Sequence, residues 1–436
     1  MSSKHPARLL IKNGTLIDGL GGPPVKNPGI YIEGDTIKNL GAPKSADDAE
    51  RWRSATTIDA ENQYVMPGLI DGHCHLSLHQ GALPGVTFTS SAEFCAFWAA
   101  RTAAQTLHAG VTSISVPGGK WFADVRVRDG INGGLLEGPR VFSAGRALTS
   151  YGGIFDDDPA YFEDSEHSSD SSGIVCNTVD EYLTEVRRQC KQGVDLIKIA
   201  DSLWGDVQTI RQEEIAAVVG EAHRRNVRVT IHARGSGATR AAALAGVDWI
   251  MHADLASDED LDVVAKAGTP IMPTFTAVYI GVEHGADLGF SVATRDRMKR
   301  QLDLNYRAIQ EARKRGIPIL AGSDTGNMSA WGHGKFHGRE PEILVKQIGL
   351  SPIEAITSMT HLNAQVVGLS CRVGAIATEK LADIIIWDAD PVADISILRR
   401  TEHLTVVIKG GAIVDRSRQG FRELPEEPPR ARSRSG

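Results

Sequence analysis

Apolar and polar residues alternate with two different periods along the chain. Between residues 8 and 65, apolar residues recur at every second position in short runs, such as 29–38, and Asn13-Gly14 is typical of a tight turn between two strands. No convincing helical pattern precedes residue 85. This segment therefore predicts a small β unit.

After residue 75, short apolar runs alternate with amphipathic helical segments up to residue 368. Several helices begin at capping residues, among them Thr178 with Glu181 and Ser351 with Glu354. The predicted strands end near residues 75, 116, 144, 200, 232, 252, 274 and 324. Repeated βα units of this kind predict an α/β fold, a (β/α)8 TIM barrel. A doubly wound sheet is the alternative, but no Gly-x-Gly-x-x-Gly follows the first strand.

The two-residue alternation returns between residues 373 and 415, which predicts that both ends of the chain build one small β-sandwich domain. The final segment is rich in Pro, Glu and Arg and is typical of disorder. The predicted organisation is then an N-terminal half-sandwich at 1–66, a barrel at 67–368, a C-terminal half-sandwich at 369–423 and a disordered tail at 424–436.

Composition narrows the class of protein. A net charge of -7 and a pI of about 6.1 provide no basic surface for nucleic acid. The five cysteines include no Cys-x-x-Cys, which argues against a thiolate zinc site. The polar N-terminus and the lack of a membrane-length apolar run predict a soluble, cytoplasmic protein without a membrane partner. Its expected partner is a small-molecule substrate.

Metal-competent residues stand at the ends of several predicted strands. In a (β/α)8 barrel these ends meet at one mouth. Each residue taken singly has an ordinary structural explanation, but their convergence favours a metal site. The set comprises His73, His75, Lys198, His232, His252 and Asp324.

Lysine is a ligand only when its ammonium loses a proton, and burial favours the neutral amine. A neutral Lys198 amine can take up carbon dioxide and form a carbamate, whose two oxygens can bridge two cations. Four histidines, one aspartate and such a bridge suit two divalent ions. The mixed nitrogen and oxygen ligands favour Zn²⁺, with Co²⁺ or Mn²⁺ as alternatives.

This set resembles the metal-binding signature of the amidohydrolase superfamily. Residues 67–75 read Pro-Gly-Leu-Ile-Asp-Gly-His-Cys-His, and residues 193–198, 322–325, 351–355 and 381–384 agree with the same pattern. Together they are similar to the branch that contains imidazolonepropionase-like and Xaa-Pro dipeptidase-like enzymes, ochratoxinase, and the molinate and phenylurea hydrolases. The resemblance extends from about residue 8 to residue 416.

The resemblance implies a role for each ligand. His73 and His75 would bind the more buried metal, and His232 and His252 the other. N6-carboxylated Lys198 would bridge them. Asp324 would ligate the buried metal and act as the catalytic proton acceptor when a hydroxide bridging the metals attacks. Relatives in this branch often form homo-oligomers, which is the expectation here.

The chain also departs from its relatives. Many carry an acid at the end of strand 2, where this chain has Ser115-Val116-Pro117. Dipeptidase-like relatives often have tyrosine where this chain has Arg234. Arg234 would either clamp a substrate carboxylate or pair with an acidic neighbour. The predicted substrate-binding residues are Arg234, Tyr279 and His337, with Tyr151, Trp204 and Phe275 as further pocket candidates and residues 156–172 as a candidate lid.

The predicted function is hydrolysis of an amide-type C–N bond in an N-acyl amino acid, a dipeptide, or an aryl amide, carbamate or urea. A deaminase or cyclic amide or amidine hydrolase is the alternative. Deaminases of the superfamily usually place a glutamate three residues after the strand-5 histidine, where this chain has Gly235. A catalytically inactive scaffold is the other alternative, and the presence of all six ligands argues against it.

Overall fold

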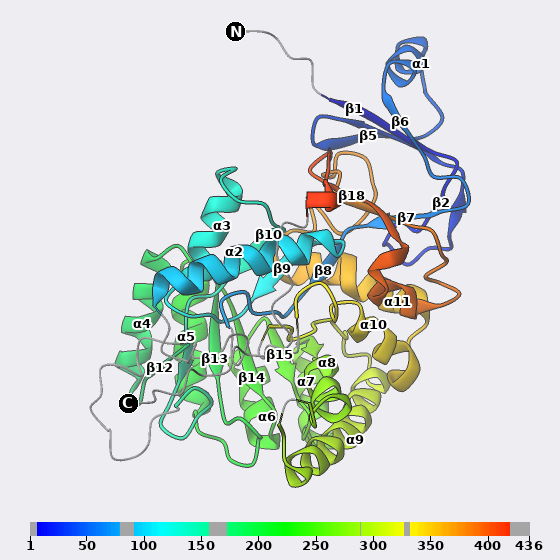
Figure 1. Cartoon of the computed structure of the whole chain (residues 1–436). Coiled ribbons are helices and arrows are strands. Elements are labelled where there is room, and N and C mark those ends of the chain that lie inside the picture. Colours follow the sequence, from blue (N-terminus) through cyan, green and yellow to red (C-terminus); the bar gives the residue numbers. More distant parts are fainter. Residues whose placement is uncertain (1–6, 79–90, 157–171, 288, 327–331, 419–436) are drawn as a thin grey trace, which may run out of the picture.

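The computed structural model describes residues 7–78, 91–156, 172–287, 289–326 and 332–418. Parallel strands lie at the centre of the larger part of the molecule, and helices surround them (Figure 1). They form a sheet of order β10-β9-β8 and a sheet of order β12-β11-β13-β14-β15-β16. The strands are β8 (Leu69–Asp71), β9 (Val111–Val116), β10 (Arg140–Ser143), β11 (Ala147–Thr149), β12 (Gly173–Val175), β13 (Leu196–Ala200), β14 (Arg228–Ala233), β15 (Trp249–His252) and β16 (Ile271–Met272).

The prediction of a regular strand ending at Asp324 is wrong. Its residues form only isolated parallel bridges, Ile319 with Ile271 of β16 and Thr325 with Cys74 after β8. Asp324 has a φ of 55°, and this left-handed backbone interrupts an extended segment. The segment nevertheless lies between the two sheets and connects them.

The helices agree largely with the sequence pattern. The long predicted helix after residue 294 is α9, and the predicted capping boxes open α4 and α11. The predicted helix 351–368 is interrupted by a π-turn, where the Thr360 hydroxyl donates to the Ile356 carbonyl oxygen at 2.7 Å. The helices and helical turns are α2 (Ala92–His108), α3 (Ala123–Asn132), α4 (Val179–Lys191), α5 (Gln212–His223), α6 (Ser236–Ala245), α7 (Asp258–Ala267), α8 (Phe275–Glu283), α9 (Val292–Lys314), α10 (Arg339–Ile343), η3 (Leu344–Ile348), α11 (Pro352–Thr357), η4 (Ser358–Leu362), α12 (Asn363–Val366), η5 (Ile395–Arg399), η6 (Thr401–His403) and η7 (Arg416–Arg418).

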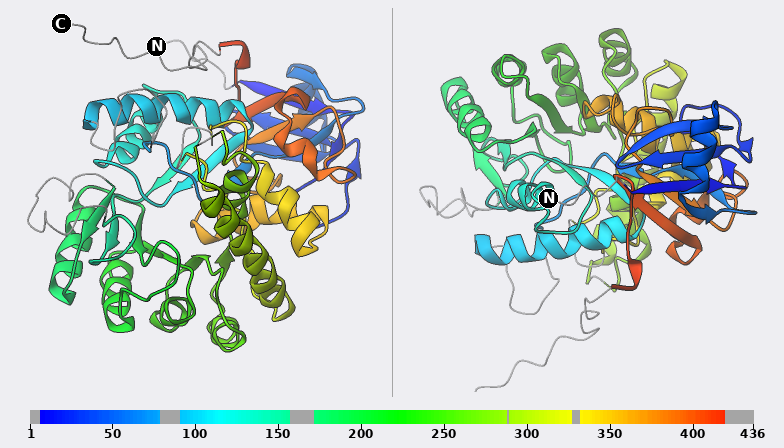
Figure 2. Two further views of the ribbon diagram at one scale, coloured as in Figure 1. Left: turned by 60° about the horizontal axis from the view of Figure 1, so that its bottom comes forward. Right: turned by 90° about the horizontal axis from the view of Figure 1, so that it is seen from above.

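Strands from both ends of the chain lie side by side, blue against orange and red in Figure 2. They form sheets of order β5-β4-β1-β6 and β19-β18-β17-β7-β2-β3, and β7 pairs with β17 antiparallel. Apolar residues of both sheets, such as Ile32 and Ile386, share one buried cluster. The strands are β1 (Arg8–Lys12), β2 (Thr15–Leu16), β3 (Val25–Lys26), β4 (Gly29–Glu33), β5 (Thr36–Gly41), β6 (Thr56–Asp59), β7 (Tyr64–Pro67), β17 (Ile384–Trp387), β18 (Leu404–Lys409) and β19 (Ala412–Ile413).

One helix in this part contradicts the predicted absence of helices before residue 85. It is α1 (Ala46–Arg53), whose first turn is capped by the Ser45 side chain. None of its residues is fully buried, but Ala49 and Trp52 are half-buried and the Trp52 ring stacks on Tyr31 of β4 with centroids 6.0 Å apart, so its apolar face is too short for a periodicity argument to detect. Its stability comes from the cap and from acidic residues in the first turn, which favour helix N-termini.

Gly68 carries the chain from one sheet to the next. It separates β7 from β8, and a Cβ at this position would lie 2.1 Å from the Thr112 hydroxyl oxygen. Only glycine permits this close approach. β8 then runs directly toward His73. None of the described helices is long and apolar enough to cross a membrane. The candidate lid lies outside the described residues except at its ends, and so does the predicted tail at 424–436.

Candidate metal centre

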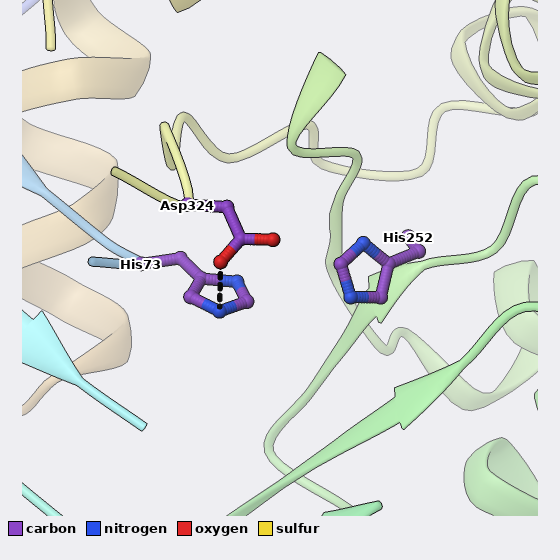
Figure 3. Close-up of side chains that lie close together, drawn as sticks. All are labelled: His73, His252 and Asp324. Atoms are coloured by element: carbon purple, nitrogen blue, oxygen red, sulfur yellow. Dashed lines mark ion pairs between the residues drawn. The ribbon is translucent and has the colours of Figure 1, made fainter. Parts of the chain in front are cut away.

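Three side chains converge just beyond the end of β8. The Nε2 atoms of His73 and His75 lie 3.1 Å apart. Asp324 Oδ1 lies 3.3 Å from His73 Nε2 and 3.1 Å from His75 Nε2. All three residues are buried, and Figure 3 shows His73 and Asp324 facing each other. The segment after β16 thus delivers Asp324 to the two histidines that follow β8.

Hydrogen bonds determine which nitrogen of His75 is free. Its Nδ1 donates to the carbonyl oxygen of Gly118 at 2.7 Å, so its Nε2 carries a lone pair. This lone pair faces Asp324 Oδ1, which is buried and has no hydrogen-bond partner among the described residues. Electron pairs held this close without a shared hydrogen repel one another. A divalent cation between them removes the repulsion, so these residues fit a metal ion.

His232 and His252 form a second pair of histidines close to His73. The rings of His232 and His252 have centroids 4.3 Å apart, and His252 is 5.7 Å from the His73 ring. One ligand atom each from His73, His252 and Asp324 lies within 4.8 Å of the others (Figure 3). The ligands predicted at four different strand ends are therefore close neighbours.

These two histidines present different nitrogens. His252 Nδ1 donates to Thr274 Oγ1 at 2.5 Å, and this hydroxyl donates to the Pro273 carbonyl oxygen at 2.8 Å. His252 Nε2 is therefore the free nitrogen. His232 Nε2 donates to the Ser202 carbonyl oxygen at 3.1 Å, which leaves Nδ1 free. Such contacts from surrounding residues orient metal-binding imidazoles and fix their tautomers.

Lys198 lies in β13, and its ammonium nitrogen is 2.7 Å from Met251 Sδ. Burial lowers the pKa of Lys198 to about 7; Arg234 also lowers it, whereas Asp324 opposes the shift. The neutral amine is therefore accessible near neutral pH. The charge of Asp324 acts on Lys198, which indicates that both belong to one electrostatic cluster.

The protonation states suit a cation. Burial lowers the pKa of His73, His232 and His252 well below the ordinary histidine value. Burial would raise the pKa of Asp324, but His73 and His75 reverse this and hold it below its usual range. Neutral imidazoles and an ionised carboxylate are the forms that bind a metal.

The backbone is strained at three residues of this site. His252, Thr274 and Asp324 have φ values of 75°, 53° and 55°. Residues with a Cβ rarely adopt this left-handed region, and such residues gather at functional sites. Sequence patterns do not reveal this feature, because none of the three is glycine or asparagine.

Asp71 is the main residue that the sequence reasoning missed. One of its carboxylate oxygens accepts from the backbone N–H groups of His73 and Ser323, both at 3.0 Å. The other accepts from Ser323 Oγ at 2.5 Å and from His337 Nδ1 at 2.6 Å. Asp71 thus joins the two segments that carry His73 and Asp324. Its position two residues before His73 was the available signal.

His337 therefore lies against Asp71, where it is buried. Its predicted contact with substrate stays a prediction. Tyr279 is not brought to the metal centre. It lines a different cavity, and the Arg339 guanidinium lies 4.4 Å above its ring. Among the further pocket candidates, Phe275 packs against Tyr306, Trp204 lies under Arg297, and Tyr151 is exposed.

Arg234 lies close enough to influence the nearby histidines and is 7% exposed. Its Nη1 donates to Asp254, and Gln301 donates to the same carboxylate oxygen at 2.8 Å. The predicted pairing with an acidic neighbour is therefore observed. Arg234 Nε is buried and has no partner among the described residues, so one donor remains available beside the histidines.

Comparison with known proteins identifies relatives. The Amidohydrolase family model matches residues 64–414. Ochratoxinase of Aspergillus niger is 26% identical over 436 residues, which cover 93% of this chain and 86% of that protein. Imidazolonepropionase of Sphingopyxis alaskensis is 23% identical over 366 residues, covering 77% of this chain and 81% of that protein.

Solved structures agree in fold. A Xaa-Pro dipeptidase with methionine bound in its active site has a TM-score of 0.81 at 28% identity, covering 94% of this chain and all of that one (100%). Molinate hydrolase has a TM-score of 0.76 at 23% identity, covering 98% of this chain and 99% of that one, and shows likeness of fold alone. Such neighbours imply a TIM-barrel-like α/β fold, which accords with the parallel strands described above.

Proposed function

The chain belongs to the amidohydrolase family, and we propose that this hydrolase cleaves an amide-type C–N bond with the help of two divalent metal ions. The observation that carries the proposal is the meeting of His73 Nε2, His75 Nε2 and Asp324 Oδ1 at 3.1–3.3 Å. Groups so arranged and buried suit a cation better than any other occupant.

His73, His75 and Asp324 would hold one ion, and His232 Nδ1 with His252 Nε2 the other. Lys198, once carboxylated, would bridge them; its burial and its place among the same charges support this role. The nitrogen and oxygen donors favour Zn²⁺ over Co²⁺ or Mn²⁺. The isolated bridges of residues 319 and 325 support closure of the parallel strands into a (β/α)8 barrel.

When bound, such ions lower the pKa of water and polarise a carbonyl group. The chain's own residues then handle the proton. Asp324 accepts it from the attacking water and delivers it to the nitrogen of the breaking C–N bond, so that an acid and an amine leave. The ring nitrogens of His73, His232 and His252 that would hold the ions have no lone pair left for this proton, whereas Asp324 has a second carboxylate oxygen.

Arg234 would position the substrate. Its charge is matched by Asp254, but its buried Nε–H has no partner among the described residues, and its guanidinium acts electrostatically on His232. An unpaired buried donor gains a hydrogen bond when a carbonyl or carboxylate oxygen arrives. N-acyl amino acids, dipeptides, and aryl amides, carbamates or ureas all offer such an oxygen. The likeness to a Xaa-Pro dipeptidase makes dipeptides the primary candidates.

The test combines metal analysis with activity on this panel. We expect close to two divalent ions per chain in metal-supplemented protein, and turnover of at least one class. Asp324→Asn should remove turnover while leaving the protein folded, whereas Asp59→Asn, an exposed carboxylate of β6, should behave as wild type. Fewer than about one ion per chain, or activity in Asp324→Asn, would contradict the proposal.

A further inference from the structure

A cavity of about 460 Å³ lies between α8, α10 and η3, apart from the metal centre. None of the proposed metal ligands lines it. Its walls combine aromatic and basic side chains. They include Tyr279, Phe336, Lys335, Arg339, Lys346 and Arg399.

Positive charge exceeds negative charge in this cavity. The lining contains four basic residues but only two acids, Glu283 and Glu342. Three of the basic side chains share Glu342, which is largely buried: Arg339 lies at 3.0 Å, Lys346 at 2.6 Å and Arg399 at 2.9 Å. One carboxylate cannot neutralise three cations. The surplus attracts an anion even though the whole chain carries a net charge of -7.

The fourth basic residue increases this surplus. Lys335 is exposed at the cavity and forms no ion pair within the described part of the chain. Glu283 is only a weak competitor, because its carboxylate lies 3.4 Å from Arg339 and 3.7 Å from the neighbouring His284 ring. The four basic residues of the lining therefore exceed its two carboxylates by two positive charges.

The apolar part of the wall limits what the anion can be. Tyr279 and Phe336 lie there with Ile280 and Ile343. The guanidinium of Arg339 is held 4.4 Å above the Tyr279 ring and its side chain is only 12% exposed. A guanidinium stacked in this way loses little freedom when it binds a carboxylate. An inorganic anion would leave the aromatic surface unused, and a neutral aromatic molecule would leave the charge unmatched.

We propose that this cavity is a second ligand site, which takes a small organic carboxylate with an apolar body. Its carboxylate lies among Lys335, Arg339 and Arg399, and its apolar body lies against Tyr279 and Phe336. The site is independent of the proposed hydrolysis, because it shares no residue with the metal centre.

Isothermal titration calorimetry on the metal-loaded full chain tests the proposal, with 3-phenylpropanoate as the probe. Acetate lacks the apolar body, 3-phenylpropanamide lacks the charge, and inorganic phosphate offers charge alone. We expect 3-phenylpropanoate to bind at least about tenfold more tightly than each of the three.

Two variants on different elements locate the binding. Lys335→Glu reverses a charge that forms no ion pair with the described residues, and Arg399→Gln removes one cation from η5. Each should weaken 3-phenylpropanoate binding by about tenfold or more. Arg400→Gln is the matched control, because Arg400 pairs with Asp394 and does not line the cavity; its affinity should equal that of wild type.

Three results would overturn the proposal. The first is absence of 3-phenylpropanoate binding at millimolar concentration. The second is binding that neither Lys335→Glu nor Arg399→Gln weakens, since this places the probe elsewhere, for example at the metals. The third is tighter binding of phosphate or of the amide than of 3-phenylpropanoate. Thermal unfolding of each variant verifies that it is folded, and one folded variant is enough to decide.

Discussion

Removal of the Asp71 carboxylate is the sharpest test of how the metal centre is built. Asp71 is fully buried and accepts four hydrogen bonds, from His73 N, Ser323 N, Ser323 Oγ and His337 Nδ1. These bonds join the segment that carries His73 to the one that carries Asp324. We therefore expect Asp71→Ala to weaken both folding and metal binding.

The magnitude follows from the donors left behind. Asp71→Ala leaves two backbone N–H groups and the His337 N–H buried without an acceptor. Each such group costs roughly 1–3 kcal/mol, and partial relaxation brings the total to roughly 3–6 kcal/mol. Asp71→Asn keeps one acceptor oxygen for the two N–H groups. His337 can then move its proton to Nε2, which has no partner in the described structure, so the loss should be only about 1–2 kcal/mol.

Urea unfolding of metal-free protein measures the loss of folding stability, and competition with a chelator measures metal affinity. Metal affinity should fall in the order wild type, Asp71→Asn, Asp71→Ala, with a loss of about 10- to 100-fold for residues that orient ligands. Asp59→Ala removes a carboxylate whose side chain is 51% exposed and serves as control. If Asp71→Ala bound metal as tightly as wild type, the reasoning would be refuted.

Three further predictions concern the same region. Thr274→Val removes the hydroxyl that accepts from His252 Nδ1, so metal affinity should drop about 10- to 100-fold with little change in far-ultraviolet circular dichroism; unchanged affinity would show that the hydroxyl does not orient His252. Burial raises the pKa of Glu340 to about 8 from an ordinary value of 4.5, so the folded state keeps a proton that the unfolded state releases. The free energy of unfolding of wild type should then fall, relative to that of Glu340→Gln, as pH rises from about 4.5 to 8. If urea unfolding gave the same difference between the two proteins at every pH in this range, the prediction would be contradicted. Removal of metal with a chelator should lower the thermal midpoint of wild type more than that of Asp324→Asn with His73→Ala, which has lost two ligands of one proposed ion, because an ion at 1,000 times its dissociation constant contributes about 4 kcal/mol; equal shifts in both proteins would place the stabilising ion elsewhere.

Local pattern was sufficient for much of the fold. Helices with an apolar face and a capping residue, such as α4 and α9, begin within a few residues of their predicted starts because both signals are local. The helix α1 has only a short, half-buried apolar face, and the predicted strand before Asp324 is interrupted by a left-handed residue. Neither feature has a periodicity that a sequence pattern can detect.

The order of apolar runs along the chain is enough to predict which ligand candidates lie close together. His73, His232, His252 and Asp324 each follow an apolar run, and parallel strands bring their ends to one side of a sheet. The orientation of these side chains depends on contacts between segments that are far apart along the chain. His75 is oriented by a carbonyl 43 residues away, and Asp71 receives His337 from 266 residues away. Which nitrogen of a histidine ring has a free lone pair depends on the hydrogen-bond partner of the other ring nitrogen. Folding brings such partners from distant segments, so the spacing of residues along the sequence does not reveal them.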